Sequence, residues 1–186
     1  MSSFDLSQLE SDELVLLVAP GNMLQDLYVE VLNHFVNERG AACVYVTVAK
    51  PYKTVNRILK ERGIQTEKML FIDCISMSGT GAIMERAGNC IFCRPESLMN
   101  ISIAMTNAFR TLPPEQERVL IMDTLSTLLL YNEAKIVGRF VHSLSVKLRE
   151  WGVKSVIFML EEGNQKEIAA ISQFCDKTLN AQACVR

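Results

Sequence analysis

Short runs of apolar residues alternate with amphipathic stretches from one end of the chain to the other. The apolar runs are continuous and rich in β-branched residues, which is typical of strands buried on both faces of a parallel sheet. These runs cover Leu14–Val18, Ala42–Val48, Met69–Asp73, Val119–Asp123 and Val153–Leu160. The pattern therefore predicts an α/β fold with at least these strands.

Between the apolar runs, apolar residues recur every three or four positions, as they do on the buried face of a helix. The predicted helices cover Leu24–Phe35 with Gly40 as the stop, Tyr52–Arg62, a stretch that begins after Pro95, and about Asn132–Trp151. Strands separated by helices indicate βαβ units. We therefore expect a three-layer fold, with a mainly parallel sheet flanked by helices.

The remaining segments are predicted to be irregular or to lie at the edge of the sheet. Ser76–Gly88 contains three glycines, and Leu112–Glu117 surrounds two prolines. Phe174–Ala181 is expected to form a last strand, with an antiparallel edge position as one option. The chain is expected to be a single domain over residues 1–186, with a core at about 12–181 and a short N-terminal extension at 1–11.

Composition narrows the functional classes. Apolar residues make up 49% and charged residues 22%, and the net charge is −2. There is no broad basic field for nucleic acid, no apolar run of the ~20 residues that a membrane span needs, and no secretory signal at the N-terminus. Six cysteines, mostly on apolar strands, favour reduced thiols and a cytoplasmic location.

The predicted fold opens with a strand, a Pro-Gly turn and a helix. A phosphate-binding loop carries G-x-x-x-x-G-K-[ST] between its strand and its helix. Here Pro20, Gly21 and Asn22 form the turn, and Leu24 and Gln25 stand where the lysine and the hydroxyl would be. The free N–H groups of the helix could still attract an anion weakly; the alternative is a simple strand–helix connection.

Two strands end in aspartate. Val119–Asp123, followed by Thr124, has the Walker B pattern, in which the carboxylate holds the magnesium of a nucleotide. Met69–Asp73 has the same pattern. Since aspartate also caps turns and helices, the motif alone does not identify a site.

The order of these segments resembles the RecA superfamily and, more narrowly, the KaiC-like (RadA/Rad55-like) ATPases. The matching motifs are Gly40–Thr47, Met69–Asp73, Pro95–Leu98, Val119–Ser126, the Asn132–Trp151 helix with the strand after it, and Asp176–Leu179. The resemblance covers about residues 12 to 181. It implies a RecA/KaiC-like, P-loop-type fold with a vestigial nucleotide site at Pro20, Gly21, Asn22, Asp123 and Thr124.

Departures from this family predict that catalysis is lost. Family ATPases place a glutamate just after the strand that resembles Tyr45–Thr47, whereas this chain continues Val48-Ala49-Lys50-Pro51. Without the lysine and the glutamate, most of the stabilisation of a phosphoryl-transfer transition state is absent. We therefore expect no catalytic residue, no required cofactor, and no catalysed reaction.

Three functions follow from these expectations. The first is a regulatory or scaffolding subunit whose partner is an active RecA/KaiC-like paralogue or a second copy. The second is a degenerate nucleotide binder or slow ATPase that holds ATP or ADP with magnesium through Asp123, the Gly21 turn and Lys50. The third is an accessory nucleic-acid-binding subunit of a repair or recombination complex. It would use a small basic patch, for which a solvated helix face is the plain alternative: Lys50, Lys53, Arg57, Lys60 and Arg62.

Two further groups of residues carry side chains that could have a chemical role. Cys90 and Cys93 could be half of a zinc site or a redox pair. The chain has no second ligand pair. Cys90–Cys93 is expected to form a short strand before Pro95, which would direct the two side chains to opposite faces. Structural thiols are therefore favoured, and no metal site is predicted. Glu161 and Glu162 follow the last parallel strand and should lie near the vestigial site, since ligand sites lie beyond the carboxyl ends of strands.

Overall fold

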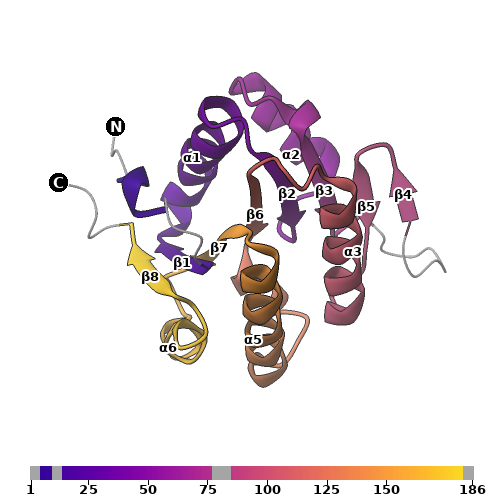
Figure 1. The fold of residues 1–186 in the computed structure, drawn as a ribbon. Coiled ribbons are helices and arrows are strands. Elements are labelled where there is room, and N and C mark those ends of the chain that lie inside the picture. Colours follow the sequence, from indigo (N-terminus) through magenta and orange to yellow (C-terminus); the bar gives the residue numbers. More distant parts are fainter. Residues whose placement is uncertain (1–4, 10–13, 77–84, 182–186) are drawn as a thin grey trace.

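One sheet of eight strands organises the computed structural model, which describes residues 5–9, 14–76 and 85–181 (Figure 1). The strand order is β4-β5-β3-β2-β6-β7-β1-β8, and every neighbouring pair is parallel except β4 and β5. The strands are β1 (Leu14–Ala19), β2 (Ala42–Thr47), β3 (Met69–Asp73), β4 (Glu85–Ala87), β5 (Cys90–Phe92), β6 (Arg118–Asp123), β7 (Lys154–Leu160) and β8 (Lys177–Asn180). The predicted mainly parallel α/β fold is confirmed.

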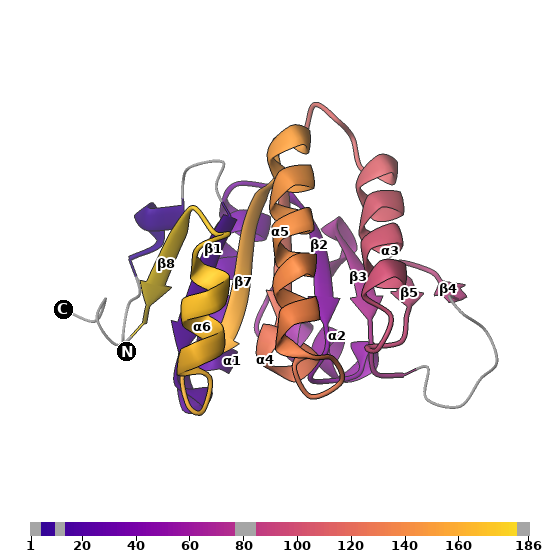
Figure 2. The same cartoon turned by 90° about the horizontal axis from the view of Figure 1, so that it is seen from below.

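Helices cover both faces of the sheet (Figures 1 and 2). One face carries α1 (Gly21–Leu32), which continues into the π-helical segment η2 (Asn33–Glu38), and α2 (Tyr52–Glu61). The other carries α3 (Leu98–Thr111), α4 (Leu125–Leu128), α5 (Ala134–Trp151) and α6 (Gln165–Ser172). Short 3-10 turns lie at η1 (Leu6–Leu9) and η3 (Thr66–Lys68). Within the described ranges, no helix is long and apolar enough to cross a membrane.

Alternate residues of the central strands feed two separate cores. In β2, Val44 and Val46 face α3 and α5, whereas Cys43 and Tyr45 face α1 and α2. All six residues of β1 and of β2 are buried. Because helices cover both faces, both sets of side chains leave water, and each large one contributes roughly 1.5–3 kcal/mol on burial. This explains why the strands are apolar without alternation.

The parallel register brings the carboxyl ends of the strands together on the same side of the sheet. Thr47 of β2 pairs with Asp73 of β3 on one side and with Asp123 of β6 on the other. β7 lies between β6 and β1, and its Leu160 pairs with Ala19. The two predicted aspartates and the Pro20 turn therefore lie together at the carboxyl ends of the strands.

The structure corrects the sequence prediction in three places. β8 pairs in parallel with β1, so the antiparallel option is wrong. α6 was not predicted; it returns the chain to the amino-terminal ends of the parallel strands before β8 begins. The strand β4 and its antiparallel pairing with β5 were also missed, whereas the short strand expected at Cys90–Cys93 is confirmed by β5. β4 lies near the end of the segment predicted as irregular, Ser76–Gly88, of which residues 77–84 lie outside the described ranges. The other predicted strands and helices agree with the structure to within a few residues.

Candidate functional site

A single residue connects β1 to α1. β1 ends at Ala19, Pro20 is the N-cap residue, and α1 begins at Gly21. The N–H of Met23 donates to the Pro20 carbonyl at 3.0 Å, which closes the first helical turn directly onto the strand. A phosphate-binding loop surrounds its anion with several backbone N–H groups before the helix begins. This connection has no such loop.

A carboxylate already faces the N-terminus of α1. Oε1 of Glu162, in the segment after β7, lies 3.4 Å from the Gly21 nitrogen. Gly21 also packs closely on β7, since a Cβ at this position would lie 3.3 Å from Cδ2 of Leu160. Asn22 is exposed. The partial positive charge of the helix end therefore has a negative neighbour, and a phosphate would meet like charge there.

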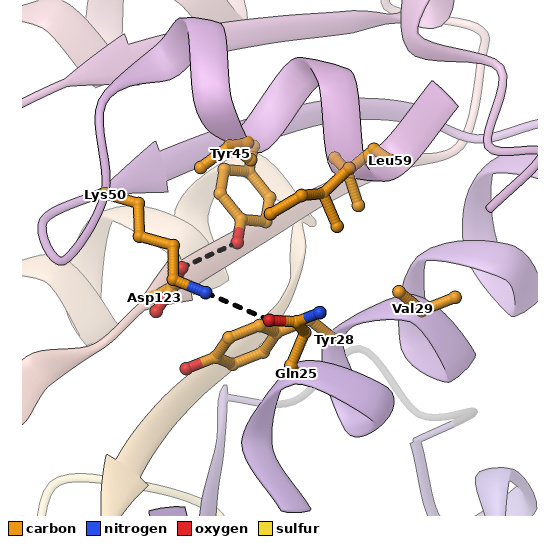
Figure 3. A pocket seen from close by; sticks show the side chains of 9 residues that line it. Gln25, Tyr28, Val29, Tyr45, Lys50, Leu59 and Asp123 are labelled. Atoms are coloured by element: carbon orange, nitrogen blue, oxygen red, sulfur yellow. Dashed lines mark hydrogen bonds between the residues drawn. The ribbon is translucent and has the colours of Figure 1, made fainter. Parts of the chain in front are cut away.

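Asp123 ends β6 with a buried carboxyl group, and the residue is 3% exposed. Its Oδ2 accepts a hydrogen bond from the Tyr45 hydroxyl at 2.9 Å (Figure 3). Its Oδ1 is buried and has no hydrogen-bond partner among the described residues. Burial raises the pKa of the Asp123 carboxyl, while the hydroxyls of Tyr28 and Tyr45 and the charge of Lys50 oppose the rise. Among the described residues, Oδ1 thus lacks a well-formed hydrogen bond, although the Tyr28 hydroxyl lies close enough to the carboxyl group to stabilise its charge.

The pocket beside Asp123 is small. Side chains from α1, α2, β2 and the β2–α2 segment line it: Gln25, Tyr28, Val29, Tyr45, Lys50, Val55, Ile58 and Leu59. Figure 3 shows the Lys50 amine reaching Gln25, to which it donates a hydrogen bond at 3.0 Å. The pocket volume is about 20 Å³, which is room for about one water molecule. A nucleotide does not fit into the pocket in this form.

The structure separates the two aspartates that the sequence motif could not separate. Asp73 accepts hydrogen bonds from the backbone N–H groups of Tyr52, Ile75 and Ser76 at 2.8–3.0 Å and from the Ser76 hydroxyl at 2.5 Å. Its carboxylate ties the start of α2 to the end of β3. Asp73 is therefore a structural residue, and Asp123 is the one with an unpartnered oxygen.

Thr124 is buried and engaged within the fold. It is the N-cap residue of α4, and its hydroxyl oxygen lies 3.0 Å from that of Thr127. The peptide bond between Asp123 and Thr124 is cis. The two predicted site residues therefore differ: Asp123 has a carboxyl oxygen without a hydrogen-bond partner among the described residues, whereas the Thr124 hydroxyl is paired with that of Thr127.

The predicted basic patch lies on α2 and the residues on either side of it: Lys50, Lys53, Arg57, Lys60 and Arg62. Arg57 pairs with Glu61 at 2.9 Å, and Arg62 pairs with Asp26 of α1 at 2.6 Å. Both pairs are exposed to solvent. They lower the local positive charge, so the patch is a mixed-charge helix surface.

Cys90 and Cys93 lie on opposite faces of the sheet, as predicted. Cys90 belongs to the core under α1 and α2, and Cys93 to the core under α3 and α5. Burial raises the pKa of both thiols to about 12. Among the residues that the structure describes, no group of three or more His, Cys, Asp or Glu side chains is placed to hold a metal.

Sequence reasoning missed the two tyrosines beside Asp123. Tyr45 could have been found, because it lies two residues before Thr47, the register partner of Asp123, and therefore projects from the same face of the sheet. Tyr28 lies one turn after Gln25 on the buried stripe of α1. It looked like an ordinary core residue, and no feature of the sequence marked its position near a carboxylate.

The strand order, the two helical layers and the aspartate at the end of β6 define a RecA-like α/β domain. The sequence model of the family described as "ATPase: KaiC" matches residues 31–179. Because this match spans most of the chain, the protein belongs to the KaiC ATPase family.

A solved structure agrees with this assignment at the level of the fold. The chain is similar to a KaiC-like protein from the hyperthermophilic archaeon Pyrococcus horikoshii OT3, with a TM-score of 0.66 and 14% sequence identity. The similarity covers 91% of this chain and 72% of that protein. No curated protein sequence matches the chain.

Proposed function

We propose that this KaiC-family domain is a regulatory or scaffolding subunit that binds other proteins and does not hydrolyse ATP. The observation that carries the proposal is the one-residue connection at Pro20, with the Glu162 carboxylate 3.4 Å from the Gly21 nitrogen. The element that would hold the phosphates is replaced by a tight turn facing a negative charge. Phosphoryl transfer depends on positioning and charge neutralisation, and neither is provided at this turn.

Further features support the loss of catalysis. The sequence has neither a phosphate-loop lysine at the turn nor a glutamate after β2, where Val48, Ala49, Lys50 and Pro51 stand. The space beside Asp123 suits about one water molecule.

Exposed apolar side chains on the α3 and α5 side support a role in protein binding. Its exposed side chains come from α3, from the segment between α4 and α5, and from α5: Met99, Ile103, Leu130, Tyr131, Ile136 and Val146. Leu130 is 80% exposed and Met99 is 74% exposed. Asn132 donates to the Pro95 carbonyl at 2.9 Å, which places this segment beside the start of α3. Where such side chains lie together, they mark interaction surfaces more often than single ones do.

The partner that fits this proposal is an active KaiC-family ATPase or a second copy of the chain. A subunit that keeps the fold but cannot turn over nucleotide could hold the geometry of an assembly or limit the activity of its neighbours.

Nucleotide titration tests the loss of the site. Purified protein would be titrated with labelled ATP and ADP in the presence of magnesium at physiological salt. We expect no binding tighter than roughly 100 μM. Saturable binding below that value that is lost in Asp123→Ala, but kept in the surface variant Asp26→Asn, would overturn the proposal.

A weak nucleotide binder or slow ATPase is the second candidate function. It is favoured by one observation, the unpartnered Oδ1 of Asp123 with the charge of Lys50 nearby. In this case α1 and α2 would have to separate to admit the nucleotide, since Tyr28 and Leu59 line the pocket from these two helices. The titration with Asp123→Ala distinguishes this function from the first.

Partner binding is tested separately. Sedimentation of the protein alone would detect self-association, and ATPase rates of an active KaiC-family protein, measured with and without this chain, would detect regulation. We expect Leu130→Ser to weaken either effect at least about fivefold, and the exposed α2 variant Lys60→Ser to leave it unchanged. If the protein does not self-associate and also leaves the ATPase rate unchanged, the proposed role is contradicted.

A further inference from the structure

A second, larger pocket lies at the amino end of β6, the strand whose carboxyl end carries Asp123. The last turns of α3 and α5 and the segment 112–117 that leads into β6 surround it. Its volume is about 240 Å³, compared with about 20 Å³ beside Asp123. It is therefore large enough for a small organic group or an amino-acid side chain.

One wall of this pocket is aromatic and apolar. The rings of Phe109 at the end of α3 and Trp151 at the end of α5 are 5.7 Å apart and tilted by 49°. Leu112 and Pro114 extend the apolar surface. Phe109 is almost fully buried, whereas Trp151 is only partly buried, so part of the indole lies in the pocket. A flat, partly exposed indole offers a large contact area to an apolar group.

The other wall is cationic. A guanidinium nitrogen of Arg118 donates to the backbone carbonyl of Trp151 at 2.7 Å, which holds the group at the C-terminus of α5, and both residues line the pocket. Since a guanidinium carries five N–H donors, others remain for a ligand. Arg110 is exposed on the last turn of α3, and no described residue bonds or pairs with its side chain.

Among the residues that the structure describes, the pocket lining contains no carboxylate. Glu117, the neighbour of Arg118 in sequence, instead pairs with Arg39 at 2.9 Å and with Lys154 at 2.8 Å. The C-termini of α3 and α5 contribute partial negative charge, but the Arg118 bond to the Trp151 carbonyl already uses part of it. The pocket thus combines two guanidinium groups and an indole without an anion of its own.

We propose that this pocket binds a carboxylate attached to an apolar body, supplied by an acidic residue that adjoins an apolar residue in a partner protein. The guanidinium groups match a carboxylate in geometry and charge, and the apolar neighbour would lie on Trp151. A nucleic acid fits less well, because Glu115 and Glu150 are exposed nearby in sequence and would repel a polyanion. The source of the carboxylate rests on the proposed protein-binding function; the pocket itself does not.

The chain has one tryptophan, so the fluorescence of Trp151 reports directly on this pocket. Phenylacetate and its neutral analogue phenylacetamide are matched probes of the proposed chemistry. We expect phenylacetate to shift the emission saturably and to bind at least about tenfold more tightly than phenylacetamide. Equal binding of the two probes, no saturable shift, or tighter binding of phenyl phosphate would overturn the proposal.

Charge-removing variants assign the response to the two arginines. Arg110→Gln removes an exposed, unpaired group and should weaken phenylacetate binding roughly threefold or more without affecting folding. Arg118→Gln should weaken it about tenfold, with circular dichroism as a check because this side chain also bonds the Trp151 carbonyl. Arg139→Gln, on an exposed part of α5 away from the pocket, is the matched control. Unchanged binding in both Arg110→Gln and Arg118→Gln would overturn the assignment.

Peptides test the source of the carboxylate. Acetyl-Phe-Glu-Leu-amide should bind in the same way and compete with phenylacetate, and acetyl-Phe-Gln-Leu-amide should not. Binding of phenylacetate without either peptide would overturn the peptide source. ATP binding that depends on Asp123, alongside intact peptide binding, would instead overturn the proposed loss of the nucleotide site and leave this pocket assignment standing.

Discussion

Asp73 and Asp123 end the two strands that flank β2, and each follows almost the same apolar pattern, yet their carboxyl groups make different contacts. Asp73 accepts four hydrogen bonds and anchors the start of α2. Asp123 accepts one from Tyr45 and leaves Oδ1 buried without a partner in the described part of the chain. The difference teaches that a strand-end aspartate is assigned by what its second oxygen contacts, which the motif does not encode.

The largest expected effect comes from Asp73→Ala. It would remove a carboxylate that satisfies three backbone N–H groups and one hydroxyl, so we expect a loss of about 3 kcal/mol in the free energy of unfolding. Urea denaturation would measure it. Asp73→Asn keeps an acceptor oxygen and should lose less. A loss below roughly 1 kcal/mol for Asp73→Ala would remove the contrast between the two aspartates.

Asp123→Asn is expected to behave in the opposite way. The amide can still accept from the Tyr45 hydroxyl, and the buried charge disappears, so stability at pH 7 should be unchanged or higher by up to about 1 kcal/mol. A decrease of more than roughly 1 kcal/mol at pH 7 would show that the charged carboxylate is stabilising. Thermal and urea unfolding of the two proteins side by side would measure the difference.

The pH dependence of this difference has a definite sign. The pKa of Asp123 is raised above its usual value of 3.8, so folding favours the protonated carboxyl group. The wild-type protein should therefore lose stability relative to Asp123→Asn as the pH rises through the range from 3.8 to the folded-state pKa. Below that range the difference should vanish. Unfolding measured across a pH series would contradict the assignment if the difference grew as the pH fell.

Asp176 gives a smaller effect of the opposite sign. Arg149 pairs with it at 2.6 Å, and the Leu14 N–H donates to it at 2.9 Å. These bonds and this charge hold the pKa of Asp176 below its usual value in spite of partial burial. The stability from this pair should be present above 3.8 and lost as the pH falls through the folded-state pKa.

Asp176→Asn should therefore cost less than about 1 kcal/mol at pH 7, because the pair is partly exposed. The same pH series would measure the loss. Arg149→Gln should give a similar loss, and the double variant should cost less than the sum of the two. Full additivity would mean that the two side chains act separately.

Glu162→Gln should have the smallest effect. The Glu162 carboxylate is exposed and lies 3.4 Å from the Gly21 nitrogen, so neutralising it should change stability by less than about 0.5 kcal/mol. ATP binding should not appear either, because the one-residue turn at Pro20 remains. ATP binding gained by this variant alone would show that charge, and not the missing loop, closes the site.

Most of the fold could be predicted from the sequence, because strands buried on both faces and helices with one apolar face leave strong periodic patterns. The short α6 and the three-residue strand β4 left weaker patterns, and the direction of β8 depended on α6. The site was harder to predict. Glu162 was expected near the turn from its position after the last parallel strand, but the contacts of Asp73 and the place of Tyr28 depend on packing between α1, α2 and the sheet.

The two outer strands of the sheet limit how copies of this domain could join. Within the described ranges, β4 has three residues and β8 has four, so these two edge strands expose few unpaired N–H and C=O groups. Long, flat borders allow neighbouring molecules to merge into one continuous ribbon, whereas short ones discourage this. A filament or ring of this domain would therefore be joined by side-chain contacts. Such contacts could break and form again without changing the backbone hydrogen bonds of the sheet.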